Sequence, residues 1–240
     1  MRFFKKSKKE TTKKPQICLS LNCKTVEGVI EEIEEFIEYA DLVEWCVDET
    51  EGSENYTKEE FIHKLLMIKS FCQKKPLIID YKKDEATGNK IQRWALGYAD
   101  IIDIDANNSE VNKLVKEAKR KKTKTLISHH VFEGMPPKDE IATQFVRMEK
   151  TNGDILKIAC YAENEIDTYA VLEAANAYTQ LKEHKPIVAI AMGEEGQASR
   201  ICAGDFGSCI SYACGSKPTA PGQFNARDLK KYLDTYYKGK

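Results

Sequence analysis

The stretch QICLSLNCKTVEGVIEEIEEFIEYADLVEWCV, residues 16–47, decides the fold of this chain. Its two short runs at 16–21 and 42–47 are rich in Ile, Leu and Val, as is typical of strands buried on both faces. Between them, residues 26–40 place apolar side chains on one helical stripe and glutamates on the other. This strand–helix–strand order predicts two parallel strands of an α/β protein.

The same alternation continues to the end of the chain. Six further strand-like runs follow, at residues 76–80, 100–104, 124–128, 154–159, 186–191 and 209–213. Helical patterns lie at 58–72, 108–122, 138–150, 163–182 and 226–238, and the segments after the third and seventh strands are less regular. Eight such units and a length of 240 residues predict a single (β/α)8 TIM barrel. An open doubly wound sheet is the alternative, although no G-x-G-x-x-G follows the first strand.

Composition and charge exclude several classes of protein. The chain is 42% hydrophobic and 31% charged with a formal net charge of −1, which excludes a disordered polyelectrolyte. No apolar run is long enough to span a membrane, so no membrane partner is expected. The eight cysteines form no C-x-x-C pair, which argues against a zinc site. Without an export signal, they are expected to be reduced thiols of a cytoplasmic protein.

The charge is concentrated at the N-terminus. Residues 1–15 carry a local charge of +6 and are expected to form a basic, disordered tail. An arm for nucleic acid or a membrane surface is the alternative, but nucleic-acid binding is not expected of the chain as a whole. Residues 16–240 contain no low-complexity linker and are expected to form one barrel domain.

One lysine stands out among the predicted strands. Lys157 lies in the middle of DILKIACYA, an otherwise apolar run. If it points into the barrel, desolvation is expected to lower its pKa and produce a neutral amine that can form a Schiff base with a carbonyl substrate. The alternative is that Lys157 faces outward and its stem passes along a helix to reach solvent.

Two histidines follow the preceding strand. Because function in a barrel gathers at the carboxyl ends of the strands, His130 is expected to reach a ligand shared with Lys157. A histidine beside an amine nucleophile is a natural proton shuttle. Neighbouring side chains diverge, so one of His129 and His130 is expected to have only a turn or capping role.

Taken together, the motifs resemble the type I 3-dehydroquinate dehydratases over roughly residues 16–240. The matching stretches are VEWCVD (43–48), IDID (102–105), ISHHVFEGMPP (127–137), LKIA (156–159), AIAMGEEGQASR (189–200) and APGQ (220–223). The resemblance implies a (β/α)8 barrel without metal or organic cofactor. It also implies conversion of 3-dehydroquinate to 3-dehydroshikimate and water, in aromatic amino-acid biosynthesis.

Position by position, the resemblance implies a role for seven residues. Lys157 matches the Schiff-base lysine of the family, and His130 matches its general acid and base. The implied substrate-binding residues are Glu44, Lys82, Arg200, Thr219 and Gln223. The implied partner is a small cyclic keto acid, and because the family often forms dimers, a homodimer is the expected assembly.

The chain departs from the family pattern at three positions. Cys46 and Lys82 each stand where the family usually has an arginine, and a lysine lacks the planar two-point recognition of a guanidinium. Ala86 stands where the family has the glutamate that orients its histidine, so Glu85 is the candidate to serve instead. Two alternatives therefore stay open: a divergent Schiff-base lyase acting on a different cyclic keto acid, and a non-catalytic ligand-binding paralogue.

Overall fold

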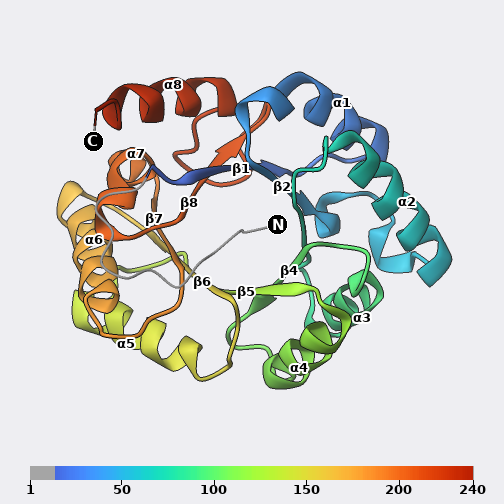
Figure 1. The fold of residues 1–240 in the computed structure, drawn as a ribbon, viewed down its shortest axis with the longest axis horizontal. Helices are drawn as coiled ribbons and strands as arrows, with labels where there is room; N and C mark the ends of the chain where they lie inside the picture. The colour runs from blue at the N-terminus through green and yellow to red at the C-terminus, as the bar shows by residue number, and fades with distance from the viewer. Residues whose placement is uncertain (1–13, 240) are drawn as a thin grey trace.

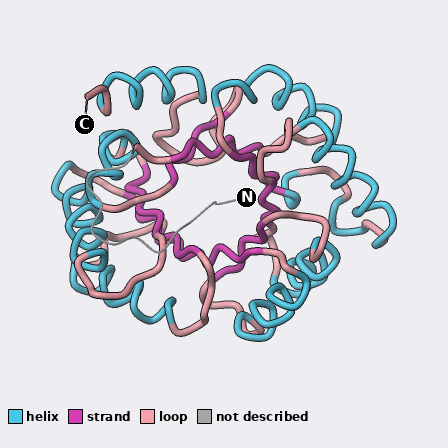
Figure 2. The backbone as a smooth tube through the Cα atoms, in the orientation of Figure 1, coloured by secondary structure: helices cyan, strands magenta, loops and turns pink. Residues whose placement is uncertain are grey.

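A computed structural model describes residues 14–239 as a ring of parallel strands surrounded by helices (Figures 1 and 2). The strands are β1 (Gln16–Leu21), β2 (Leu42–Cys46), β3 (Leu77–Asp80), β4 (Ile101–Asp105), β5 (Lys124–Val131), β6 (Ile155–Tyr161), β7 (Ile187–Met192) and β8 (Ile210–Cys214). The α-helices are α1 (Val26–Phe36), α2 (Lys58–Phe71), α3 (Glu85–Ala95), α4 (Val111–Lys121), α5 (Lys138–Glu149), α6 (Glu165–Thr179), α7 (Gln197–Cys202) and α8 (Ala226–Tyr236). Each strand is followed by a helix, as predicted.

The strands form a nearly closed barrel. Their order is β7-β6-β5-β4-β3-β2-β1-β8, and every neighbouring pair in this order is parallel. Between β7 and β8, Ile187 and Ser208 form a single bridge, and the Cys209 amide donates a 2.8 Å hydrogen bond to the Ile187 carbonyl. The TIM-barrel prediction is therefore confirmed, and the open sheet is wrong.

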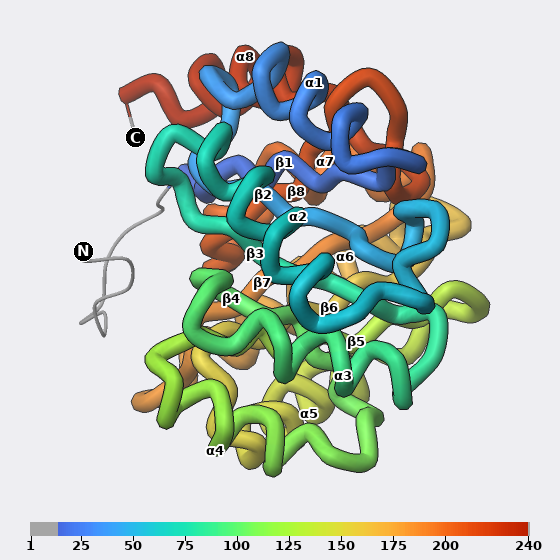
Figure 3. Tube along the Cα trace, turned by 90° about the vertical axis from the view of Figure 1, so that its right-hand side faces the viewer, coloured from blue at the N-terminus to red at the C-terminus, as the bar shows by residue number. Residues whose placement is uncertain are grey.

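The two ends of the barrel sequence meet on the outside of the ring. Helix α8 lies beside α1 in two perpendicular views (Figures 1 and 3). Arg227 of α8 lies 5.3 Å above the ring of Tyr39, which follows α1. This contact is a cation–π interaction that joins the last helix to the first.

Two apolar cores explain why these residues fold this way. Side chains of a strand alternate between the barrel interior and the surrounding helices. One core packs the outer faces of the strands against the helices, for example Trp45 stacked on Phe61 with ring centroids 5.9 Å apart. The other fills the interior and includes Ile78 and Ile155. Two residues further along their strands, these give way to Asp80 and Lys157, so the interior becomes polar at the carboxyl ends of the strands.

The element bounds agree with the sequence predictions to within a few residues. The largest difference at a strand is in β5, which runs three residues past the predicted end and includes His129 and His130. Those two residues are therefore strand residues on opposite faces rather than turn residues. Helix α7 is short, at six residues, which explains the weak helical pattern after the seventh strand.

The basic N-terminal segment is described only at its end. Residues 1–13 lie outside the described residues, so the expectation of a disordered tail is untested there. Pro15 is buried, and Lys14 pairs with Asp234 of α8, so the barrel extends two residues into the predicted tail. Within residues 14–239, no helix is both long and apolar enough to cross a membrane.

Candidate active site

Lys157 points into the barrel. Its side chain is 6% exposed, and Nζ lies 3.2 Å from Oδ2 of Asp103 and 3.6 Å from Oε1 of Glu44. On another side, Nζ lies 4.4 Å from the centroid of the Tyr212 ring. The outward-facing alternative for this lysine is therefore wrong.

The expected direction of the Lys157 pKa is also wrong. Burial alone lowers the pKa of Lys157, but the carboxylates of Glu44 and Asp103 outweigh burial and raise the pKa above its ordinary value. Sequence reasoning accounted for desolvation and missed two buried counter-ions. The resting side chain is an ammonium, and the same carboxylates stabilise any cation formed at this nitrogen.

His130 lies on the adjacent strand. Ser128 pairs with Lys157 in the register of β5 and β6, and His130, two residues further along, faces the same interior. Burial lowers the pKa of His130 to about 3, and the ammonium group of Lys157 acts in the same direction. Its ring stacks on Phe132, with centroids 5.9 Å apart and planes 8° apart. The imidazole is therefore neutral at neutral pH and can accept a proton.

Lys82 is engaged by protein groups. Its Nζ lies 2.5 Å from Oδ1 of Asp103, 2.8 Å from Oγ of Ser128 and 3.0 Å from Oδ1 of Asp80. An ammonium has three donors; two are used in hydrogen bonds to Asp103 and Ser128, whereas the contact with Asp80 is an ion pair without a hydrogen bond. Lys82 thus lies in the site as expected, as the counter-ion of two buried carboxylates.

Arg200 lies at the other side of the site and is 3% exposed. It donates 3.3 Å and 2.8 Å hydrogen bonds to the carbonyls of Tyr212 and Pro221. Its Nε is buried and has no hydrogen-bond partner among the described residues. Burial lowers the pKa of Arg200 to about 10, so the guanidinium remains charged at neutral pH and is suited to bind an anion.

The loop after β8 connects to Glu44 through hydroxyl groups. Oγ1 of Thr219 lies 3.1 Å from Oγ of Ser20, which donates a 2.7 Å hydrogen bond to Oε2 of Glu44. Oε1 of Gln223 accepts hydrogen bonds from the Thr219 amide and hydroxyl, at 2.6 Å and 3.0 Å. Thr219 and Gln223 are therefore brought together at the site, with the Gln223 oxygen holding the loop.

Glu85 takes a different partner from the expected one. Its carboxylate accepts hydrogen bonds from the hydroxyl and the amide of Ser109, which precedes α4. Within residues 14–239, no hydrogen bond joins Glu85 to His130. The stacked Phe132 ring, rather than a carboxylate, holds the imidazole in this structure.

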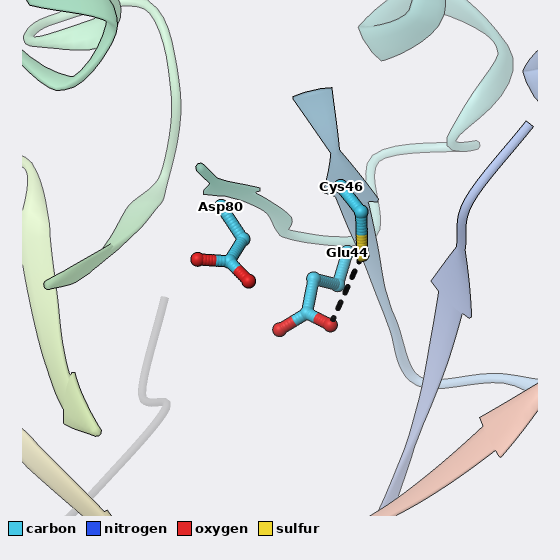
Figure 4. Close-up of side chains that lie close together, drawn as sticks. All are labelled: Glu44, Cys46 and Asp80. Atoms are coloured by element: carbon cyan, nitrogen blue, oxygen red, sulfur yellow. Dashed lines mark hydrogen bonds between the residues drawn. The ribbon is translucent and has the colours of Figure 1, made fainter. Parts of the chain in front are cut away.

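Glu44, Cys46 and Asp80 lie together at the ends of β2 and β3 (Figure 4). One potential ligand atom from each lies within 4.8 Å of the others, which is a spacing that a metal ion could use. However, both carboxylates already pair with lysines, and burial raises the pKa of the Cys46 thiol well above its ordinary value. This donor set therefore suits hydrogen-bond donors better than a metal cation.

Four further residues shape the site, and the sequence assigned a role to none of them. Asp103 binds both lysines, Ser20 links Glu44 to the closing loop, Tyr212 covers Lys157, and Asp80 lies beside Lys82. Only Asp103 and Asp80 could be recognised in the sequence as candidates, because each is a charged residue within or at the end of an apolar strand. Polar residues at the carboxyl ends of closed parallel strands define the class of (β/α)8 barrel enzymes.

Comparison with known proteins gives the family. Residues 17–240 match the family model described as type I 3-dehydroquinase. A 3-dehydroquinate dehydratase of Clostridioides difficile is 28% identical, covering 94% of this chain and 93% of the relative, and one of Alkaliphilus oremlandii is 30% identical, covering 93% and 92%. A crystal structure of the type I 3-dehydroquinate dehydratase of Clostridium difficile with covalently modified comenic acid has a TM-score of 0.87 at 26% identity, covering 95% and 94%. The chain belongs to the type I 3-dehydroquinase family.

Proposed function

We propose that this protein is a 3-dehydroquinate dehydratase, a hydro-lyase that forms 3-dehydroshikimate and water through a Schiff base on Lys157. The observation that carries the proposal is a buried lysine between two carboxylates, next to a neutral histidine. Family membership and the curated relatives of the same name support the substrate.

The first step is formation of the imine. Lys157 must lose a proton before its nitrogen attacks the C3 ketone, and the neutral imidazole of His130 on the adjacent strand is the base proposed to accept it. Loss of water from the adduct leaves an iminium, whose positive charge falls between Glu44 and Asp103. Fixed charges of this kind stabilise a cation without reorganising at the moment of reaction.

The second step is proton transfer. The iminium withdraws electrons from C2, so the C2 proton becomes acidic and His130 removes it to give an enamine. The C1 hydroxyl then leaves as water with the proton returned by His130, and hydrolysis of the imine frees the product and Lys157. General acid–base catalysis of this type contributes about 10²- to 10⁴-fold. Burial and Lys157 lower the pKa of His130, so its imidazole is neutral at neutral pH and has a free nitrogen to accept the C2 proton.

Arg200 is proposed to bind the substrate carboxylate. Its buried Nε lacks a partner among residues 14–239, and its two protein hydrogen bonds fix the guanidinium plane. Thr219 and Gln223 complete this side of the site from the loop after β8. Such fixed donors orient C1 for elimination.

The biological setting follows from the reaction. We place the enzyme in aromatic amino-acid biosynthesis through the shikimate pathway, in the cytoplasm, where the eight free thiols would stay reduced. We expect a homodimer, no metal and no organic cofactor.

Borohydride trapping tests the proposal. Incubation with 3-dehydroquinate and borohydride is expected to leave one covalent adduct, mapped to Lys157 by mass spectrometry, and absorbance of 3-dehydroshikimate is expected without borohydride. Lys157→Ala should fold and give neither signal. Lys75→Ala, which changes a lysine that binds the carbonyls of Ile37 and Ala40, is the matched control and should retain both. Absence of both signals from the wild-type protein would refute the function.

A further inference from the structure

The wall formed by β2 and β3 presents two carboxyl groups and a thiol where the family usually presents arginines. Glu44 and Asp80 are 3% and 7% exposed, and the Cys46 thiol beside Glu44 is held neutral by burial (Figure 4). Lys82, the only cation that β3 and its following loop direct at this wall among the described residues, donates hydrogen bonds to Asp103 and Ser128 and forms an ion pair with Asp80. A ligand approaching this wall therefore meets carboxyl groups and the lysine that pairs with them, and no guanidinium.

These carboxylates have unused hydrogen-bonding capacity. Oε1 of Glu44 and Oδ1 of Asp80 are buried and accept no hydrogen bond from residues 14–239, although each lies in an ion pair. A carboxylate oxygen has two lone-pair sites, so an ion pair leaves room for a second donor. Asp80, Lys82 and His130 line one cavity of about 410 Å³, so a ligand next to the imidazole can reach Asp80. Buried polar atoms of this kind require a donor to offset their desolvation.

We propose that Asp80 is a specificity-determining residue that, with Glu44, accepts hydrogen bonds from neutral ring hydroxyls of the substrate and rejects rings bearing a second anionic group. This proposal rests on the proposed function for the identity of the ring, and it assigns the contact from β3 to Asp80 in place of Lys82. Lys82 acts as the counter-ion that keeps two buried carboxylates, Asp80 and Asp103, close together.

The selected substrate class is a cyclic hydroxy ketone with a single carboxylate. Among the described residues, Arg200 is the cation of this site that forms no ion pair with a carboxylate, and it is proposed to bind the substrate carboxylate. A phosphate or second carboxylate on the distal side of the ring would face the Glu44 carboxylate and Asp80, whose pKa burial raises to about 7, in a buried site with no guanidinium to pair with, and like-charge contact disfavours such a ring. Hydroxyls on that side would instead supply the missing donors.

Equilibrium binding of three non-reacting rings tests the proposal without turnover. The probes are quinate, which carries ring hydroxyls, cyclohexanecarboxylate, which carries none, and cyclohexane-1,4-dicarboxylate, which carries a second anion. Calorimetry on the wild-type protein is expected to rank quinate at least 10-fold tighter than cyclohexanecarboxylate, with the dicarboxylate weakest. A hydrogen bond to a charged group contributes about 1.5–3 kcal/mol, which corresponds to roughly 10- to 100-fold.

Two variants separate the wall from the rest of the site. Asp80→Asn should reduce the preference for quinate over cyclohexanecarboxylate by about 10-fold, and Cys46→Arg should raise the affinity for the dicarboxylate above that for cyclohexanecarboxylate. Thermal melting checks that each variant is folded. If Asp80→Asn does not fold, Cys46→Arg tests the proposal by itself. Asp100→Asn, which changes an aspartate that precedes β4 and pairs with Lys69, is the matched control. An unchanged preference in folded variants overturns the proposal, whereas failed borohydride trapping with an intact preference overturns only the function.

Discussion

Nζ of Lys157 lies 3.2 Å from Oδ2 of Asp103, a carboxylate with no exposed surface. The other oxygen of Asp103 binds Lys82, so one buried anion serves two ammonium groups. Burial alone raises the pKa of Asp103, but Lys82 and Lys157 outweigh it and hold that pKa below its ordinary value. Asp103 is therefore the shared counter-ion of the two buried lysines.

Asp103→Asn is expected to destabilise the protein and to lower the pKa of Lys157. Removing one partner of a buried ion pair typically costs about 3–5 kcal/mol, since it leaves an uncompensated charge. Denaturant unfolding measures the loss, and the pH dependence of borohydride trapping should shift to lower pH. Asp234→Asn is the control, because Asp234 pairs with Lys230 at the surface and its loss should cost no more than about 1 kcal/mol. Similar losses of unfolding free energy in Asp103→Asn and Asp234→Asn would contradict a special role for the buried ion pair.

The loop that carries Thr219 and Gln223 depends on a close approach of two glycines. Gly222 has a φ of +72°, and a Cβ placed there would lie 2.0 Å from the carbonyl oxygen of Gly193. The Gly193 amide donates a 3.2 Å hydrogen bond to the carbonyl of Pro221, which also binds Arg200. Any side chain at residue 222 must therefore displace the loop from the guanidinium.

Gly222→Ala is expected to lower kcat/KM for 3-dehydroquinate by on the order of 10- to 100-fold, because a misplaced clamp loses the orientation of the substrate. Gly97→Ala is the matched control, since Gly97 has a φ of +86° but nothing within 4 Å of its Cβ position. Both variants bear the cost of a left-handed alanine, about 1–2 kcal/mol. Steady-state kinetics measure kcat/KM for both variants. A comparable loss of kcat/KM in Gly97→Ala would exclude the contact between Gly222 and Gly193 as the cause.

The barrel could be predicted from the sequence because its signal is local. Each buried strand is a short aliphatic run, and helices such as α1 and α4 carry a clear apolar stripe. The extension of β5 could not be predicted, because SHHV lacks aliphatic character and its strand pairing depends on β6. Tertiary pairing thus outweighs local propensity at His129 and His130.

The site residues could be predicted by position, but their electrostatics could not. Lys157, His130 and Arg200 lie at the carboxyl end of the barrel, as expected from the strand order. The pKa of Lys157 depends on ion pairs with Glu44 and Asp103, which come from strands distant in the sequence. Sequence spacing does not show that these side chains are in contact. For the same reason, the partner of Glu85 became visible only in the folded chain.

His130 and Asp80 are expected to give opposite pH dependences of stability. The unfolded histidine takes up a proton near pH 6.5, but folded His130 does so only near pH 3, so the free energy of unfolding falls as the pH drops through this window. Burial raises the pKa of Asp80 to about 7 from 3.8, so the folded state takes up this proton first and gains stability over the same fall in pH. The two effects largely cancel in the wild-type protein.

Substituting either residue alone should reveal the pH dependence of the free energy of unfolding that the other residue causes. Between pH 6.5 and 4, His130→Asn is expected to gain stability relative to the wild type, and Asp80→Asn is expected to lose it, each by up to about 1.4 kcal/mol per pH unit. The groups facing Asp80 are Glu44 of β2, Lys82, Asp103 of β4 and Lys157 of β6, all retained in both variants. Urea unfolding at several pH values measures the slopes, with His63→Asn on the exposed face of α2 as the control for loss of a histidine. Slopes of the same sign in the two site variants would show that Asp80 does not hold a proton near neutral pH.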